Sequence, residues 1–301
     1  MSWKNKRKIE VIYILRWSKL LSTYIFSMVS ALSTVVLMSL YGYPSFNSWA
    51  KFYGKVYNPG SDFDYRHTVF YNNVARIYEH NTNHAGSWSM SINKFADLTA
   101  KEFYEAYVLG GYGDSVNSTA TFKESTMCGV NDEEVDWVGR GYVTPVKNVR
   151  GRAWSVVAAG AIESMWAIRY GRLFNLSNTD FSGCTSADCA FEYASMNGVR
   201  GGNGSVLAYT KGFVKVPFSS LEDAVVRRPV AVGLYVDPLA FQFYSGGVLD
   251  CVSRGVNYAS LVVGYEADYF RLKNSWGTDW GMDGYFLVQR DCAMVGSYPF
   301  V

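Results

Sequence analysis

Two kinds of hydrophobic periodicity follow one another in the second half of the chain, and they constrain its fold more than any other sequence feature. From Trp154 to Tyr170 the apolar residues recur with helical spacing, at Val157, Ala161, Met165 and Ile168. After Arg200 the pattern changes to short runs of valine, tyrosine and phenylalanine, broken by glycine and proline, at 230–236, 258–265, 269–273 and 285–290. The sequence therefore predicts a helical part followed by a β part.

The N-terminal region predicts a membrane anchor. Residues 1–19 carry six basic groups and one acidic group, and residues 20–43 carry none. Such a run is about the 20 residues that a helix needs to cross a bilayer, and it exceeds the 7–15-residue core of a cleaved signal peptide. We expect a basic cytosolic tail, a signal-anchor helix over 20–43, and the rest of a single-pass protein on the non-cytosolic side, in the secretory or endolysosomal lumen. A cleaved signal peptide and the mitochondrial inner membrane are the alternatives.

Composition excludes several classes of protein. A hydrophobic content of 49% with 18% charged residues is that of a folding chain. Beyond residue 19 there are 22 basic residues (28 − 6) and 25 acidic ones (26 − 1), so no basic surface for nucleic acid is expected. The cysteines and histidines lack metal-ligand spacing and there is no glycine-rich phosphate loop. We therefore expect no metal, no cofactor and no nucleic acid.

A second helical row lies within residues 46–107. Its six members are spaced by four, four, three, four and four residues, which keeps them on one helical face: Asp62, Arg66, Phe70, Asn73, Ile77 and Asn81. A shorter motif follows at Asn93, Phe95 and Asp97. Together they resemble the motifs of the cathepsin propeptide inhibitor domain, with Asp62 in place of a glutamate. This resemblance implies a small α-helical pro-domain over 46–107, and the glycine- and serine-rich stretch within 108–130 is typical of a linker.

Three later segments carry a second resemblance. Residues 147–155, 256–259 and 274–281 are similar to the three active-site segments of a papain-like cysteine peptidase. The implied fold class is α+β, a papain-like two-lobed domain over 131–301. It would have a helical left domain, a β-barrel-like right domain and a cleft between them.

The resemblance also shows which chemical groups differ from the family pattern. Amide hydrolysis by this route needs a thiolate, an imidazole and an oxyanion donor. By the resemblance the nucleophilic cysteine position holds Ala153, the histidine position Tyr258 and the oxyanion glutamine position Val149, whereas Asn274 and Trp276 are retained. An alanine methyl has no nucleophilic atom, and tyrosine, with an ordinary pKa of about 10, is a poor proton shuttle near neutrality.

From these differences we expect a catalytically inactive homologue. Its expected role is that of a membrane-anchored scaffold or interaction protein, or a subunit of a membrane complex, with the pro-domain retained and with protein partners. The alternatives are a peptide-binding module freed by another protease, and an atypical peptidase. Phe191 and Glu192 stand where the family has two glycines, so we expect their side chains to obstruct peptide binding.

Five cysteines leave at least one unpaired within the chain. The resemblance implies a disulfide between Cys251 and Cys292. Cys184 and Cys189 match half-cystines whose partners are missing, so they either pair with each other or stay reduced. Cys128 lies at the junction of pro-region and mature-like region.

Overall fold

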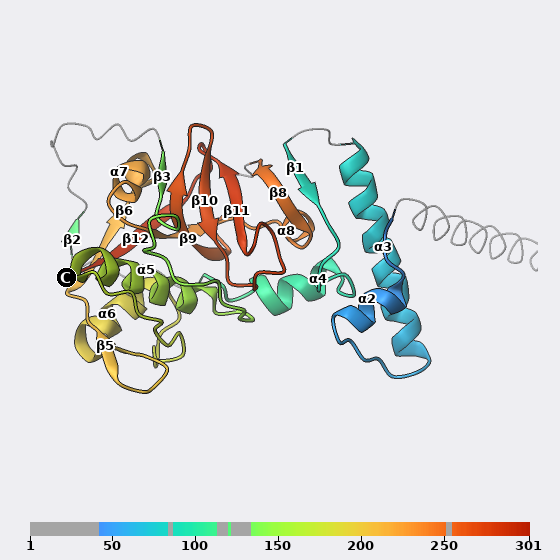
Figure 1. Cartoon of the computed structure of the whole chain (residues 1–301), viewed down its shortest axis with the longest axis horizontal. Helices are drawn as coiled ribbons and strands as arrows, with labels where there is room; N and C mark the ends of the chain where they lie inside the picture. Colours follow the sequence, from blue (N-terminus) through green and yellow to red (C-terminus); the bar gives the residue numbers. More distant parts are fainter. Residues whose placement is uncertain (1–41, 84–86, 113–119, 122–133, 251–254) are drawn as a thin grey trace, which may run out of the picture. The chain divides into compact units, whose positions relative to one another are not determined.

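The computed structural model describes residues 42–83, 87–112, 120–121, 134–250 and 255–301, which form two compact units (Figure 1). The first unit ends at Arg76 and the second runs from Ile77 to Val301. Each unit is built around its own apolar residues, and each is described separately below.

An aromatic cluster organises the first unit. Helix α2 (Phe46–Phe52) begins after Ser45, whose hydroxyl accepts the Ser48 backbone N–H at 3.3 Å. The buried Phe46 ring lies 5.5 Å from that of Phe70, on helix α3 (Ser61–Asn83). The six spaced residues from Asp62 to Asn81 thus fall on one continuous helix, as their spacing predicts.

The second unit contains most of the β structure. Its strands are short, as the sequence pattern indicates: β1 (Trp88–Met90), β2 (Ala120–Thr121), β3 (Val135–Asp136), β4 (Val199–Arg200), β5 (Val206–Ala208), β6 (Gly212–Val216), β7 (Val230–Leu234), β8 (Tyr244–Leu249), β9 (Tyr258–Tyr265), β10 (Tyr269–Lys273), β11 (Tyr285–Gln289) and β12 (Val295–Phe300).

Ten of these strands form one sheet. Nine follow the order β1-β8-β11-β10-β9-β7-β12-β6-β2, β3 pairs with β9, and β4 and β5 make a separate ribbon. Among the described strands the order has two ends, β1 and β2, so the sheet does not close. The expectation of a β-barrel-like domain is therefore wrong, because the sheet is open. Its two edge strands, β1 and β2, both precede residue 131 in the chain.

Helices pack around this sheet. They are α4 (Ala100–Phe103), a π-helical turn (Tyr104–Val108), α5 (Ala153–Tyr170), α6 (Ala187–Asn197), a 3-10 turn (Phe218–Ser220), α7 (Leu221–Val225) and α8 (Pro238–Phe241). The alanine-rich α5 is buried on nearly all sides and packs against β9 and α6 (Figure 1). One apolar cluster lies between α5, α6 and the sheet, and a second lies within the sheet and under α4. This is a two-lobed α+β architecture.

The membrane anchor expected over residues 20–43 is not supported. In the part of the chain that the structure describes, no helix is both long enough and apolar enough to cross a bilayer. Residues 20–41 of the expected span, and the basic tail at 1–19, lie outside the described residues.

The structure decides the pairing of some of the cysteines. Cys184 and Cys189 form a disulfide with their Cα atoms 5.5 Å apart, which decides between the two expected alternatives. Cys292 is also disulfide-bonded. Cys251 and Cys128 lie outside the described residues, so the Cys251–Cys292 pairing stays a prediction.

Candidate functional site

The site begins at the first turn of α5. Ala153 is its first residue and is fully buried, and Arg152 precedes it in the left-handed region at φ 42°. The Ser155 hydroxyl donates to the Arg152 carbonyl at 2.9 Å and is itself buried. The start of this helix therefore presents a methyl group at residue 153 and a hydroxyl that is already committed to the backbone.

Tyr258, the first residue of β9, lies opposite the motif that begins at Asn274. Its hydroxyl donates to Asn274 Oδ1 at 2.8 Å and lies 3.0 Å from Ser275 Oγ. The Trp276 ring centroid is 5.2 Å from that of Tyr258. Burial raises the pKa of Tyr258 well above its ordinary value, although the hydrogen bond to Ser275 partly opposes the rise. The phenol is therefore neutral at physiological pH.

The loop before α5 is fastened to the same motif by backbone bonds. Val149 N–H donates to the Ser275 carbonyl at 2.8 Å, and Gly277 N–H donates to the Lys147 carbonyl at 3.0 Å. The Val149 side chain is apolar and half-buried. It has no donor to offer an oxyanion.

A segment of the chain itself occupies the groove between the start of α5 and β9. The Trp154 backbone N–H donates to the Gly111 carbonyl at 3.0 Å, and the Arg150 Nε–H donates to the Tyr107 hydroxyl at 3.0 Å. Gly111 lies so close to Tyr258 that an added Cβ would approach its Cδ2 to 2.6 Å. Residues 104–112, called the groove segment below, thus lie directly over the position expected to be catalytic.

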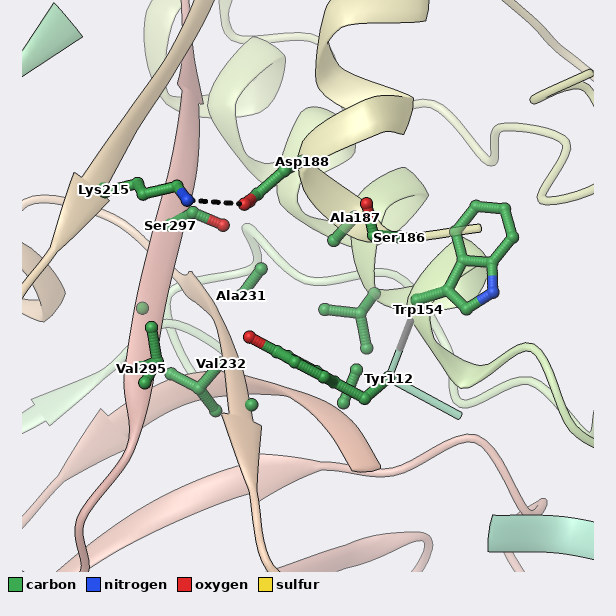
Figure 2. A pocket seen from close by; sticks show the side chains of 14 residues that line it. Tyr112, Trp154, Ser186, Ala187, Asp188, Lys215, Ala231, Val232, Val295 and Ser297 are labelled. Atoms are coloured by element: carbon green, nitrogen blue, oxygen red, sulfur yellow. Dashed lines mark ion pairs between the residues drawn. The ribbon is translucent and has the colours of Figure 1, made fainter. Parts of the chain in front are cut away.

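The last residue of the groove segment fills a pocket. Figure 2 shows the Tyr112 side chain among Trp154, Ala187, Asp188, Ala231 and Val232. The space left there is about 30 Å³, so little more than water-sized groups fit beside Tyr112. Burial and the Asp188 carboxylate both raise the pKa of Tyr112.

Two further features shape this pocket. Asp188 forms an ion pair with Lys215 at 3.6 Å (Figure 2). A Cβ at residue 233 would come within 2.2 Å of the Tyr112 ring, so only glycine fits there while Tyr112 is in place. The pocket therefore combines apolar walls with an ion pair, and the Tyr112 ring lies against Gly233 in its wall.

The short pro-region motif lies next to this site. The Asn93 amide donates to the Gln242 carbonyl at 2.7 Å, and Phe95 packs edge-on against Trp276 at 6.2 Å. Lys94, between them, pairs with Asp279 at 2.7 Å. Asp97 is buried. These contacts bring residues 93–97 against the 274–281 segment.

The structure places Phe191 and the groove segment differently from the expectations drawn from the sequence. Phe191 does not obstruct the groove: it is fully buried on α6 against Phe213, at 6.0 Å between ring centroids. The sequence assigned the groove segment in two pieces, 104–107 to the pro-domain and 108–112 to the linker, because its glycines are typical of loops. No pattern in the sequence indicated that Gly111 and Tyr112 contact α5. Among the described residues there is no cluster of metal-ligating side chains.

Known proteins resemble both the pro-region and the later part of this chain. The model of the papain family cysteine proteases matches residues 131–209 and 200–298, and that of the cathepsin propeptide inhibitor domain matches 46–103. The senescence-specific cysteine protease SAG12 of Arabidopsis thaliana is 32% identical, over 84% of this chain and 88% of its own. Procathepsin L of Mus musculus is 28% identical, over 85% and 91%. The solved structure of a recombinant stem bromelain precursor superposes with a TM-score of 0.75 at 29% identity, over 85% and 97%.

These comparisons overturn the expected role. The family that matches is one of cysteine proteases, and SAG12 is named as such, so the prediction of a non-enzymatic scaffold is wrong. The expected single-pass location is wrong as well. It rested on the apolar run over 20–43 and its basic flank, whereas no helix of the described residues could cross a bilayer and relatives such as procathepsin L align with most of the chain. The relationship to this family covers both the pro-region and the two lobes, so three altered positions do not outweigh it.

Proposed function

The chain belongs to the papain family of cysteine proteases and carries a cathepsin propeptide inhibitor domain, and from that premise we propose that it is a peptidase made as a latent proform. The groove of this peptidase receives polypeptide substrates, and the groove segment occupies that groove until the segment is displaced. One observation carries this proposal: the Trp154 N–H donates to the carbonyl of Gly111, which precedes the papain-like domain in the same chain.

Two kinds of contact support a polypeptide as the natural occupant. The hydrogen bond to the Gly111 carbonyl recognises main chain, which every polypeptide offers. The Tyr112 pocket recognises a side chain next to it. Main-chain bonds that give affinity, beside pockets that give specificity, are how extended peptides are bound.

We propose a domain division to match: a pro-domain over 46–107, a linker over 108–130 and a papain-like domain over 131–301. We also propose that Ala153, Tyr258 and Val149 stand at the family's cysteine, histidine and glutamine positions, with Asn274 and Trp276 retained. A methyl at residue 153 supplies no nucleophile, and the buried Tyr258 phenol does not shuttle protons at neutral pH. Hydrolysis by this chain therefore uses a nucleophile other than a thiol at residue 153.

The test is a hydrolysis assay on the full chain before and after one cut. A recognition sequence for a specific protease replaces part of residues 122–130, and hydrolysis of a quenched fluorescent peptide library is followed. We expect hydrolysis to appear on cutting and to resist a thiol-alkylating reagent. The benchmark is the double variant Ala153→Cys with Tyr258→His, whose activity should be abolished by that reagent.

The control carries a scrambled recognition sequence and is treated with the same protease. If the cut chain keeps its circular dichroism spectrum but hydrolyses nothing beyond this control, while the benchmark does, the peptidase proposal is overturned.

A further inference from the structure

A second cavity lies at the opposite end of α5 from the groove. Its volume is about 400 Å³, and it is lined by Met165, Ile168, Arg169, Arg228, Phe300 and Val301. Arg169 is 16 residues beyond Ala153 on the same helix, which places their backbones about 24 Å apart. None of the lining residues takes part in the peptide groove, so this cavity belongs to a separate site.

Arg228 is held in the wall of this cavity with an incomplete set of partners. Its Nη1 donates to the Pro299 carbonyl at 3.3 Å, and its guanidinium lies 4.7 Å from the centre of the Tyr298 ring. Its Nε is buried and has no hydrogen-bond partner among the described residues. Because this Nε has almost no exposed surface, a ligand in the cavity would reach the guanidinium through its Nη atoms.

Arg169 adds a second positive charge. Its side chain is exposed in the last turn of α5. In the described part of the chain, neither Arg169 nor Arg228 forms an ion pair with an aspartate or a glutamate. No aspartate or glutamate lines the cavity. Burial, with a smaller contribution from Arg227, also lowers the pKa of Arg228, as expected of a guanidinium without a counter-ion.

We propose that this cavity binds a small apolar carboxylate. The carboxylate pairs with Arg169 and Arg228, and the apolar body packs against Met165, Ile168 and Phe300. Guanidinium groups bind carboxylates through charge-assisted, often bidentate hydrogen bonds. A cavity of about 400 Å³, lined by both apolar side chains and arginines, lies within the size range of small-molecule sites. Free organic acids and the C-terminal residues of peptides both carry such a carboxylate. This inference is independent of the peptidase proposal.

The test compares acids with their amides on the full-length chain. The probes are octanoate against octanamide, and acetyl-valyl-phenylalanine against its C-terminal amide. Binding is measured by calorimetry and by the NMR shift of the Met165 methyl group. We expect at least one acid to bind about tenfold more tightly than its amide, the difference expected from one charge-assisted hydrogen bond. Octanoate alone identifies a free acid as the ligand, and the dipeptide alone identifies a peptide C-terminus.

Three variants locate the binding. Arg169→Gln and Arg228→Met should each weaken the acid about tenfold, whereas Arg227→Gln, at an exposed neighbour outside the cavity, should change it less than twofold. If Arg228→Met does not fold, Arg169→Gln decides, because its side chain is exposed. Acids that bind no better than their amides, or equal binding by wild type and Arg169→Gln, would overturn the proposal.

Discussion

The hydroxyl of Tyr258 is the polar centre of the candidate site. It is buried under Trp276 and joined to Asn274 and Ser275 by hydrogen bonds. Asn274 Oδ1 also accepts the Ser275 backbone N–H at 2.8 Å. Because water does not reach these atoms, each bond lost leaves a buried polar group unsatisfied.

Replacement of Tyr258 by phenylalanine tests this arrangement. We expect Tyr258→Phe to lower the free energy of unfolding by about 1–2 kcal/mol, since the ring still packs but Asn274 and Ser275 lose a shared partner. Urea denaturation measures the change. Tyr170→Phe is the matched control, because that side chain is half-exposed on the last turn of α5 and should shift stability by less than about 0.5 kcal/mol. Equal stability of the two variants would contradict the account.

A buried lysine sits one residue before Asn274. Lys273 Nζ donates to the Thr144 carbonyl at 2.7 Å and to the Thr144 hydroxyl at 3.1 Å, and that hydroxyl donates to the buried Glu163 carboxylate. Burial lowers the pKa of Lys273 to about 8, although Glu163 opposes the shift. The charged form is therefore disfavoured by folding.

The sign of the pH dependence follows from that shift. Between about pH 8 and the ordinary lysine pKa of 10.5, the unfolded chain holds a proton that the folded chain has lost, so stability rises with pH. Between pH 8 and 9.5, before unfolded tyrosines ionise, this group should add about 1–2 kcal/mol. The increase should be absent in Lys273→Met, and the difference between the two unfolding curves is the measurement. Parallel curves would show that Lys273 titrates normally.

At the scale of elements, periodicity alone predicted much of the fold. Helix α5 and strands β9 and β10 lie where their apolar patterns place them, and β7 and β11 end within two residues of expectation. These elements are predictable because their side chains are largely buried, which leaves runs or regular spacings of apolar residues in the sequence. The groove segment is different, since its position depends on the backbone bond to Trp154, the Arg150–Tyr107 hydrogen bond and the Tyr112 pocket. None of these leaves a periodic signal in the sequence. The expectation that Phe191 obstructs the groove was wrong for a related reason. The resemblance gave its position in the chain but not the direction of its side chain, which is buried against Phe213.

The groove segment is held by shape, and Gly233 tests this. A Cβ at residue 233 would overlap Tyr112, so Gly233→Ala should displace the groove segment without changing any of its residues. We expect chymotrypsin to cut within 104–112 about tenfold faster, as mass spectrometry of the fragments would show. Gly246→Ala is the control, because its added methyl would have no neighbour closer than 3.8 Å. Equal cutting rates in the two variants would mean that Tyr112 does not anchor the segment.

At the scale of the whole molecule, the pro-region and the papain-like region share one hydrophobic core. Phe95, Phe103 and Val108 belong to the same buried cluster as Trp276 and the sheet strands. The match to the propeptide domain ends at residue 103, yet the compact unit that contains its last part begins at Ile77. Residues 77–112 are therefore packed into the same unit as the papain-like region and do not form a separate domain within it.

The most direct test of the account is hydrogen exchange at the Trp154 backbone amide in the intact chain. That amide is protected only while its N–H donates to the Gly111 carbonyl, because it lies in the first turn of α5. We expect slow exchange in the wild type and exchange at least about tenfold faster in Tyr112→Ala, with amides beyond Val157 unchanged. Fast exchange at Trp154 in the wild type, or no effect of Tyr112→Ala, would contradict the claim that the protein's own residues 104–112 occupy its polypeptide groove.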